Sequence, residues 1–564
     1  MTRTATPPRG ASPAPWGSSA PDTVHHGTRA AGARTAPLPV TGPASGHRGR
    51  WAAPGPGQRG AGAPHDAPTD RMPVVGRASG SGPRVRGIDA ARGLALLGMI
   101  AVHTLPTSED GALTTVGLLA GGTSAALFGL LVGVSVALLT GRRRVAVGAG
   151  SFGTHALRLA VRGLAVGVLG LALGEAALGD VDIILTHYGV LFLLAVPLIL
   201  LPTRALFALG AVLAVAAPAT SFLVRAGMPA TDLVDPSFTT LITDPAGSLT
   251  SLFLTGAYPI WPWLTYLCVG IAVGRCSLAR TRTAAVLAVS GVVLVVTAAV
   301  VSTLALVNAG GLGHILADPG LPADELQAAL TEGPNGVTPA TTWWWLAVDT
   351  AHSSTPLDLA RTVGTSLVAL GAMLLLDQAL SRGGSSPWAR VVGAARAPLA
   401  AAGSMTLTFY TLHVVVVGLA PETEPWTLYL VQVTFALLVG LLWQRSVGRG
   451  PLEAGVSTLT DVVAPSPTSR PSTDRPPATR PWRAGLVAAV LLAVIVGGAF
   501  AVAGDRTADT SSVTSEQGEG TASDVDENVS GDVTEADEPD VPDGQDGSDR
   551  QGQQSEPDLA DEDD

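Results

Sequence analysis

Long apolar stretches dominate the middle of the chain and constrain its fold more than any other feature. Each has roughly 18–26 residues, and about 20 apolar residues in a helix cross the hydrocarbon core of a bilayer. They fall near residues 88–106, 114–139, 156–176, 182–201, 204–226, 259–276, 284–308, 357–379, 397–419, 426–444 and 484–503. The sequence therefore predicts an all-α fold: a polytopic membrane helix bundle with about ten core transmembrane helices and one more C-terminal transmembrane helix.

Charged residues are scarce and unevenly distributed, which excludes an ordinary soluble enzyme. Only 14% of the residues are charged, against about 25% in an average soluble domain. The net charge is −11, yet residues 505–564 hold 21 acidic residues and two arginines, a local charge of −19. Residues 1–504 therefore carry +8, and the acidic balance belongs to the C-terminal end alone.

Composition and hydropathy divide the chain into five segments. The first and last segments contain too few apolar residues to offset chain entropy, so we expect both to be disordered. The predicted segments are a disordered cytoplasmic arm rich in Pro, Ala, Gly and Arg (1–83), a transmembrane core (84–455), a cytoplasmic linker (456–483), the eleventh transmembrane helix (484–503) and a disordered acidic extracellular tail (504–564).

Arginine clusters give the expected orientation of the bundle. The clearest cluster, residues 142–144, follows the second apolar stretch, and others precede the first stretch or follow the sixth, eighth and tenth. The intervening loops carry acidic residues instead. Because short cytoplasmic loops are enriched in Lys and Arg, we predict a multi-pass membrane protein with a cytoplasmic N-terminus and an extracellular C-terminal tail.

The first apolar stretch carries three ionisable residues that a helix would place on one face. Asp89 and Arg92 are three residues apart and can form an ion pair. Arg92 and His103 differ by about 20° around the helix and by about 16 Å along it. Ionisable groups inside a membrane are costly and usually functional, and this arrangement suits a long anionic ligand that reaches from Arg92 to a general base at His103. An ion pair at the membrane boundary and an interfacial histidine remain the alternative.

Five further side chains are candidates for binding a substrate near the outer side of the membrane. They are His187, Tyr188, His352, Tyr410 and His413. Histidines titrate near neutral pH, and the three here could converge with His103 around one outward-facing cavity. Hydrogen bonding within the core or at the interface is the alternative for each. We expect no metal site, because the sequence contains no zinc-binding pattern.

Aromatic residues begin the sixth apolar stretch. Trp261, Trp263 and Tyr266 lie at the end that the orientation places outside. Trp and Tyr are enriched where a membrane meets water, so we expect these residues to anchor the helix at the interface. Stacking on a sugar is the alternative.

Several segments resemble one family of membrane proteins. The stretch RVRGIDAARGLALLGMIAVH (84–103) is similar to the first helix of the heparan-alpha-glucosaminide N-acetyltransferase-like family. Further similar segments are SAALFGLLVGVSVALLTGRRR (124–144), HYGVLFLLAVPLILL (187–201), WPWLTYLCVGIAVGR (261–275), AHSSTPLDLARTVGTSLVALGAMLLL (351–376), GSMTLTFYTLH (403–413) and GRGPLE (448–453). The resemblance is to bacterial members of the family and covers about residues 84–455.

The resemblance implies an acyltransferase of a bacterial cell membrane. An acyl group, in the first place acetyl, would pass from acyl-CoA on the cytoplasmic side to a cell-envelope glycan or glycolipid, with acyl-CoA as co-substrate and no permanently bound cofactor. Arg92 would contact the CoA phosphates, and His103, with Asp89 nearby, would form the catalytic centre. A covalent acyl-histidine and a general-base role for His103 both remain open. The bilayer and the acceptor are the expected partners, and we expect no nucleic acid.

A secondary transporter or a lipid flippase that uses the intramembrane ionisable residues is the second hypothesis. Transporters usually consist of two similar halves with interrupted helices in corresponding positions. Residues 88–226 and 259–444 show no convincing repeat. The sequence therefore favours the acyltransferase, and binding of acyl-CoA would distinguish the two.

Overall fold

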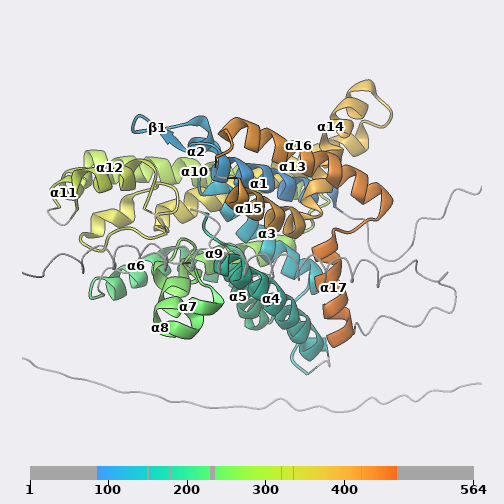
Figure 1. The fold of residues 1–564 in the computed structure, drawn as a ribbon, viewed down its shortest axis with the longest axis horizontal. Helices are drawn as coiled ribbons and strands as arrows, with labels where there is room; N and C mark the ends of the chain where they lie inside the picture. Colours follow the sequence, from blue (N-terminus) through green and yellow to red (C-terminus); the bar gives the residue numbers. More distant parts are fainter. Residues whose placement is uncertain are drawn as a thin grey trace, which may run out of the picture. The chain divides into compact units, whose positions relative to one another are not determined.

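The computed structural model describes residues 85–148, 151–176, 181–228, 235–318, 321–334, 336–420 and 422–465 (Figure 1). The chain divides into two units, Met1–Gly80 and Ser81–Asp564, and every described residue belongs to the second. The expected N-terminal arm, linker residues 466–483, the eleventh transmembrane helix and the acidic tail lie outside the described residues.

The described residues are mostly helical, as predicted. The helices are α1 (Arg86–Thr104), α2 (Thr115–Ala120), α3 (Thr123–Leu139), α4 (Ser151–Glu175), α5 (Leu185–Leu198), α6 (Thr203–Arg225), α7 (Phe238–Thr243), α8 (Pro245–Thr250), α9 (Ile260–Gly274), α10 (Thr281–Thr303), α11 (Gly311–Leu316), α12 (Ala323–Thr331), α13 (Pro356–Arg382), α14 (Pro387–Gly403), α15 (Thr406–Leu419), α16 (Pro425–Ser446) and α17 (Pro451–Val463). Two π-helical segments follow α8 and α10 directly (Ser251–Thr255 and Leu304–Asn308), and a 3-10 helix (Trp343–Ala347) precedes α13. The strands β1 (Ser108–Glu109) and β2 (Ala112–Leu113) pair antiparallel after α1. This small hairpin is the one departure from an all-α fold among the described residues.

The lengths and compositions of the helices identify a multi-pass membrane protein. Six described helices could cross a membrane: Thr115–Leu139, Ser151–Glu175, Thr203–Arg225, Thr281–Asn308, Pro356–Arg382 and Pro425–Ser446. Two bent pairs, α8 with α9 and α14 with α15, raise the number to eight if each pair is one span. Helix α5 has only 14 residues, and charged residues in the first two turns of α1 lower its hydropathy. The expected count of ten core spans is therefore not confirmed within the described residues.

Helix α1 packs against more of the bundle than a peripheral helix would. It contacts α3, α13, α14, α15 and α16, and its Leu96 and Ile100 are almost completely buried. Glycine permits the closest approach: a Cβ on Gly93 would overlap the backbone of Leu399 on α14, and one on Gly403 would overlap the backbone of Asp89. Small residues at such crossings bring helix backbones together. Helix α14 is thereby fixed against the α1 turn that carries Asp89 and Arg92.

The apolar stretch 397–419 is not the continuous span that we expected. The chain bends by 77° between α14 and α15. Glu453, on α17, accepts hydrogen bonds from the backbone N–H groups of Leu407 (2.7 Å) and Thr408 (3.2 Å) and from the Thr408 hydroxyl (2.6 Å). A carboxylate at a helix N-terminus satisfies free N–H groups and interacts favourably with the helix dipole. Helix α15 therefore begins as a new helix at Thr406.

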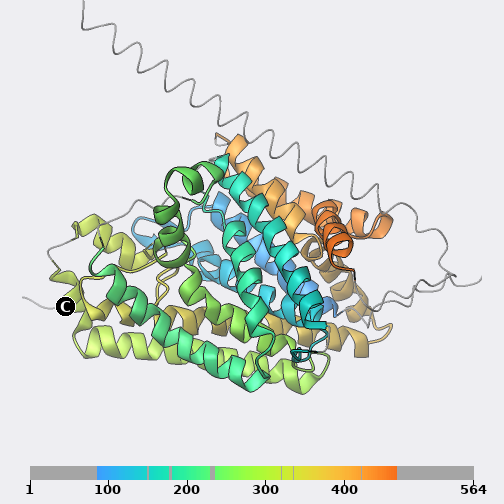
Figure 2. The ribbon, with the colours of Figure 1, turned by 90° about the horizontal axis from the view of Figure 1, so that it is seen from below.

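Helices α4 and α5 form an antiparallel pair, visible at the centre of Figure 2, and α17 packs against α4. Arg158 on α4 pairs with Asp461 (2.7 Å) and donates a hydrogen bond to the carbonyl oxygen of Ala464 (2.6 Å). Residues 456–463, which we assigned to the linker, thus lie in a helix attached to the bundle.

The aromatic residues of α9 correct the expectation of an interfacial anchor. Trp263 and Tyr266 are buried, with exposed fractions of 5% and 3%, and belong to the main hydrophobic core. Only Trp261 reaches the surface, where its indole N–H donates to the hydroxyl of Thr220 (2.8 Å). Trp263 instead packs near Tyr188 and Tyr258. These rings therefore help to build the interior near the candidate site.

Candidate active site

The ionisable residues of α1 are fixed by contacts within the bundle. The Arg92 guanidinium donates to Asp89 Oδ1 (2.9 Å), which confirms the expected ion pair, and to Ser135 Oγ on α3 (2.7 Å). Asp89 is 6% exposed. A charge buried this far requires a partner and hydrogen bonds, and Arg92 supplies them. The pair is therefore tied to a neighbouring helix rather than lying free at a surface.

His103 lies in a chain of three hydrogen-bonded side chains from three helices. Its Nδ1 lies 2.8 Å from Nε2 of His413 on α15, and Nδ1 of His413 lies 2.8 Å from Oε1 of Gln432 on α16. The imidazole rings are inclined by only 7° and their centroids are 5.0 Å apart. His413 and Gln432 are buried. The structure thus brings together two of the four candidate histidines and adds Gln432, which we did not predict.

The other two candidate histidines both lie next to Tyr258. The centroid of its ring is 5.7 Å from that of His187, in an edge-on contact, and 5.8 Å from that of His352. His352 is also close enough to His103 for the two to interact electrostatically. The four histidines therefore gather in one region, as a hydrogen-bonded pair and an aromatic group centred on Tyr258. His413 lines a small apolar cavity with Gln432, whereas the cavity that Tyr188 and Tyr410 line includes none of the four histidines.

His352 has an unusual backbone and environment. Its φ is +55°, in the left-handed region that non-glycine residues seldom occupy. Its carbonyl oxygen accepts a hydrogen bond from the Gly336 N–H (3.0 Å), which holds the loop in place. Burial, with a smaller contribution from the positive charge of Arg361, lowers the pKa of His352 to about 4. This imidazole is therefore neutral at physiological pH, and strained backbones of this kind cluster at functional sites.

Tyr188 and Tyr410 line the end of a cavity that lies next to the histidine pair. The Tyr188 hydroxyl donates to the carbonyl oxygen of Ala125 (3.1 Å), and the Tyr410 hydroxyl accepts a hydrogen bond from the Ile184 N–H (3.4 Å). The ring of Tyr410 lies 6.3 Å from that of His413. Tyr410 therefore contacts both the cavity and the histidine pair.

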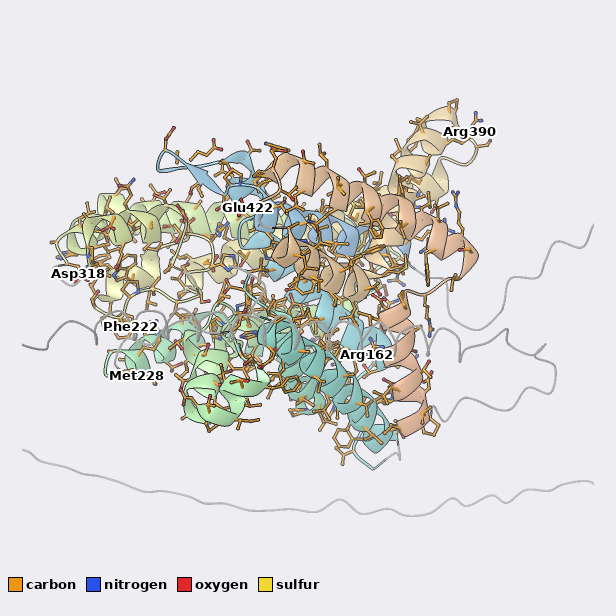
Figure 3. The ribbon with its side chains drawn as sticks, viewed as in Figure 1. Arg162, Phe222, Met228, Asp318, Arg390 and Glu422 are labelled. Carbon is orange, nitrogen blue, oxygen red and sulfur yellow. The ribbon has the colours of Figure 1, made fainter. Side chains whose placement is uncertain are left out.

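The cavity between these tyrosines and Arg92 has a volume of about 370 Å³. A second cavity, of about 320 Å³, adjoins it, and Leu139, Arg162, Ser404 and Glu453 line both. Such volumes are typical of small-molecule sites, which usually measure about 300–1,000 Å³. Figure 3 shows Arg162 on α4 near α17. The two cavities together run from the tyrosines to the surface between α4 and α17.

Arginines dominate the electrostatics of these cavities. Arg92 and Arg162 line the first, and Arg158, Arg162 and Arg449 line the second. The carboxylates that line the second cavity are Glu453 and Asp461; Asp461 pairs with Arg158, and Glu453 caps α15. Burial raises the pKa of Glu453, although its hydrogen bonds from Thr408 and Leu407 act in the opposite direction. An anionic ligand therefore meets an excess of positive charge here.

Part of this site has a further signal in the sequence, beyond the candidate residues named there. Arg158 and Arg162 are four residues apart within the predicted span 156–176, and ionisable residues in a span usually have a function. Gln432 and Glu453 gave no comparable signal. Each acquires its role from a partner on another helix, His413 for Gln432 and α15 for Glu453.

The arrangement provides an anion-binding end and a proton-accepting end. His103 follows Arg92 by eleven positions on α1, which corresponds to about 16 Å along the helix. Arginines can hold phosphate groups through bidentate, charge-assisted hydrogen bonds. A histidine can accept a proton from a hydroxyl or an amine near neutral pH. The site therefore suits a long ligand with an anionic end and a reactive end.

Comparison with known proteins finds a family model that matches the first part of the core. Residues 84–307 match the family model described as heparan-alpha-glucosaminide N-acetyltransferase, catalytic. The match confirms the family resemblance over these residues, which hold Asp89, Arg92, His103, His187 and Tyr188, and it indicates a membrane acyltransferase. His352, Tyr410, His413 and Gln432 lie outside the matched range. No curated protein and no solved structure matches the chain significantly.

Proposed function

We propose that this protein is an integral membrane acyltransferase of a bacterial cell membrane. It takes an acetyl or other small acyl group from acyl-CoA on the cytoplasmic side and transfers it to a cell-envelope glycan or glycolipid. The observation that carries the proposal is the arrangement along α1: Arg92 lines an arginine-rich cavity, and His103, three turns further on, lies in a hydrogen-bonded histidine pair.

The arginine-rich cavities are the proposed binding site of acyl-CoA. The nucleotide end of CoA carries several phosphate charges, and Arg158, Arg162 and Arg449 supply matching charge in the second cavity. Arg92 supplies it in the first cavity, where the ion pair with Asp89 and the bond to Ser135 keep the guanidinium in place. In this proposal Asp89 acts through Arg92. Acyl-CoA is a co-substrate, and the protein needs no permanently bound cofactor.

His103 is the proposed general base. A hydroxyl or amine of the acceptor attacks the thioester carbonyl carbon and forms the new bond to the acyl group. His103 accepts the proton that the acceptor loses, the carbon–sulfur bond breaks, and the proton passes to the CoA thiolate. General-base catalysis of this kind contributes about 10²–10⁴-fold to the rate. Tyr188 and Tyr410 lie where the cavity approaches the histidine pair.

The group of His187, Tyr258 and His352 is the proposed acceptor side. Both ring nitrogens of His187 are buried, and apart from a contact with the backbone of Ile183 they meet no polar partner among the described residues. Hydroxyl groups of a sugar are suitable partners for such nitrogens. The distribution of arginine in the loops predicts that this end of the bundle faces outward, where a cell-envelope acceptor is found.

The test is acyl transfer by the purified full-length protein in lipid vesicles. We would supply radiolabelled acetyl-CoA with glucosamine as the probe acceptor, and we would measure binding of free CoA in parallel. His103→Ala should abolish transfer and leave CoA binding intact. His314→Ala is the matched control, because His314 lies exposed on α11 against Trp344. Transfer by His103→Ala at the wild-type rate would refute the mechanism, and no CoA binding at millimolar concentration would favour a transporter.

A further inference from the structure

Helix α16 buries three positions along one face, and one of them is polar. Its buried residues are Gln432, Ala436 and Gly440, spaced four residues apart. Much of the remaining surface is apolar and exposed, as at Leu438 and Leu442. A buried amide in a membrane-spanning helix costs free energy unless it is hydrogen-bonded. The contacts that Gln432 makes therefore point to its role.

Gln432 lies at one end of the three-residue chain that ends at His103. The distances along the chain are 2.8 Å from Gln432 Oε1 to His413 Nδ1 and 2.8 Å from His413 Nε2 to His103 Nδ1. Nearly parallel rings with centroids 5.0 Å apart and nitrogens 2.8 Å apart are joined edge to edge. The hydrogen bond between the two imidazoles therefore runs close to both ring planes, where imidazole nitrogens donate and accept.

The direction of these hydrogen bonds follows from the chemistry of the groups. An amide oxygen only accepts, so His413 Nδ1 donates its proton to Gln432. A neutral imidazole carries one N–H, so His413 Nε2 must accept, and His103 Nδ1 must donate to it. The lone pair of His103 then lies on Nε2, which has no hydrogen-bond partner among the described residues.

We propose that Gln432 and His413 are positioning residues that hold His103 in the tautomer whose Nε2 is free to accept a proton. We had placed His413 among the residues that bind the substrate; its hydrogen bonds instead assign it to orienting His103. The catalytic consequence rests on the proposed function, whereas the tautomer is a property of the protein without substrate. The two are therefore tested separately.

The tautomer is tested by nitrogen-15 NMR of the full-length protein labelled at histidine, in lipid vesicles near neutral pH. The His103 signals are assigned by their loss in His103→Asn. We expect a protonated Nδ1 and an unprotonated Nε2 in the wild-type protein and in Gln432→Glu, which keeps an acceptor at this position. Gln432→Met should lose this preference. A protonated Nε2 in the neutral wild-type His103 would overturn the proposal whether or not the protein transfers acetyl groups.

The catalytic role is tested by the kinetics of the same variants. Gln432→Met should lower kcat by about 10- to 100-fold, a part of what a general base contributes. It should leave the KM for acetyl-CoA unchanged, because Gln432 lines neither arginine-rich cavity. Gln432→Glu should restore kcat and move the acidic limb of the pH profile to higher pH, because a carboxylate stabilises the protonated histidine pair.

The control is Gln378→Met on α13, which removes another glutamine with one hydrogen bond, to the carbonyl oxygen of Leu278. It should leave kcat unchanged. A wild-type kcat in Gln432→Met would overturn the catalytic role. The catalytic role would also be overturned if Gln432→Met lost kcat and Gln432→Glu did not restore it while CoA affinity stayed intact in both variants. That result would show that Gln432 only packs the helices.

Discussion

Replacing Arg162 by methionine should weaken the binding of CoA by about 10- to 100-fold. Arg162 lines both arginine-rich cavities, so a phosphate group in either one comes within its reach. A hydrogen bond to a charged group is worth about 1.5–3 kcal/mol, and about 1.4 kcal/mol corresponds to a tenfold change in Kd. Arg162 is partly exposed, which screens its charge and keeps the expected loss below the upper end of that range.

Arg162 is the most informative of the arginines to remove. Arg92 pairs with Asp89, and Arg158 pairs with Asp461, so replacing either one also leaves a carboxylate without its partner. Arg162 has no hydrogen bond or ion pair among the described residues, and methionine keeps much of its apolar stem. Arg162→Lys should lose less affinity, because lysine keeps the charge but cannot bind a phosphate with two parallel hydrogen bonds.

The assay is a titration of free CoA into the purified full-length protein in lipid nanodiscs, followed by calorimetry at low and high salt. Arg390→Met is the matched control, because Arg390 lies exposed on α14 and lines none of the cavities discussed here (Figure 3). We expect the difference between wild type and Arg162→Met to shrink at high salt, since salt screens the partly exposed charge. Unchanged affinity in Arg162→Met would refute the assignment of these cavities to CoA.

Two further predictions concern stability. Glu453→Ala should lower the free energy of unfolding by about 3 kcal/mol, because two N–H groups at the start of α15 lose charge-assisted hydrogen bonds worth about 1.5–3 kcal/mol each. Glu453→Gln keeps an acceptor and should lose less stability. The measurement is the thermal midpoint followed by tryptophan fluorescence, and equal midpoints for Glu453→Ala and wild type would contradict the prediction. Burial and the negative charge of Asp182 raise the pKa of Asp235 from 3.8 to about 7, although the hydrogen bond from the Ile183 N–H lowers it. The folded protein therefore favours the protonated, neutral form of Asp235. The stability that this preference contributes is fully present below the unfolded-state pKa of the carboxyl and is lost as the pH rises through its folded-state pKa. Asp235→Asn should raise the thermal midpoint at pH values above 7 and not near pH 3, and an equal effect at both would count against the buried carboxylate.

The sequence predicts those parts of the fold and site that depend on local spacing. Apolar stretches mark helices because an 18-residue apolar segment has few alternatives in a membrane. The pair of Asp89 and Arg92 follows from their spacing of three residues on α1. The neighbourhood of His103 and His413 was also expected, because both lie in the halves of their spans that the orientation places outside. The boundaries of the described helices differ from the predicted stretches by a few residues, except at 397–419, where α14 begins at Pro387 and the chain bends before α15.

Contacts between distant segments could not be predicted in the same way. Gln432 is one polar residue in an apolar stretch, and nothing in its neighbours indicates that it bonds to His413. Glu453 lies in a short segment after the tenth stretch, and its role at α15 requires knowing that α17 returns to the bundle. The burial of Trp263 likewise depends on partners such as Tyr188 and Tyr258. Each of these roles is set by tertiary contact, which overrides what composition alone predicts.

The break between α14 and α15 explains how one short helix serves both ends of the proposed reaction. A continuous helix over 397–419 would present no free N-terminal N–H groups to Glu453, and its second half would run 77° away from the direction that α15 takes. His413 would then point away from His103 and Gln432. Because Gly403 packs against the α1 turn of Asp89, the break is also held next to the donor cavity. Helix α15 thus lines the donor cavity with its first turn and carries His413 two turns later. Because both belong to one rigid helix, the distance from the bound acyl donor to the base is fixed.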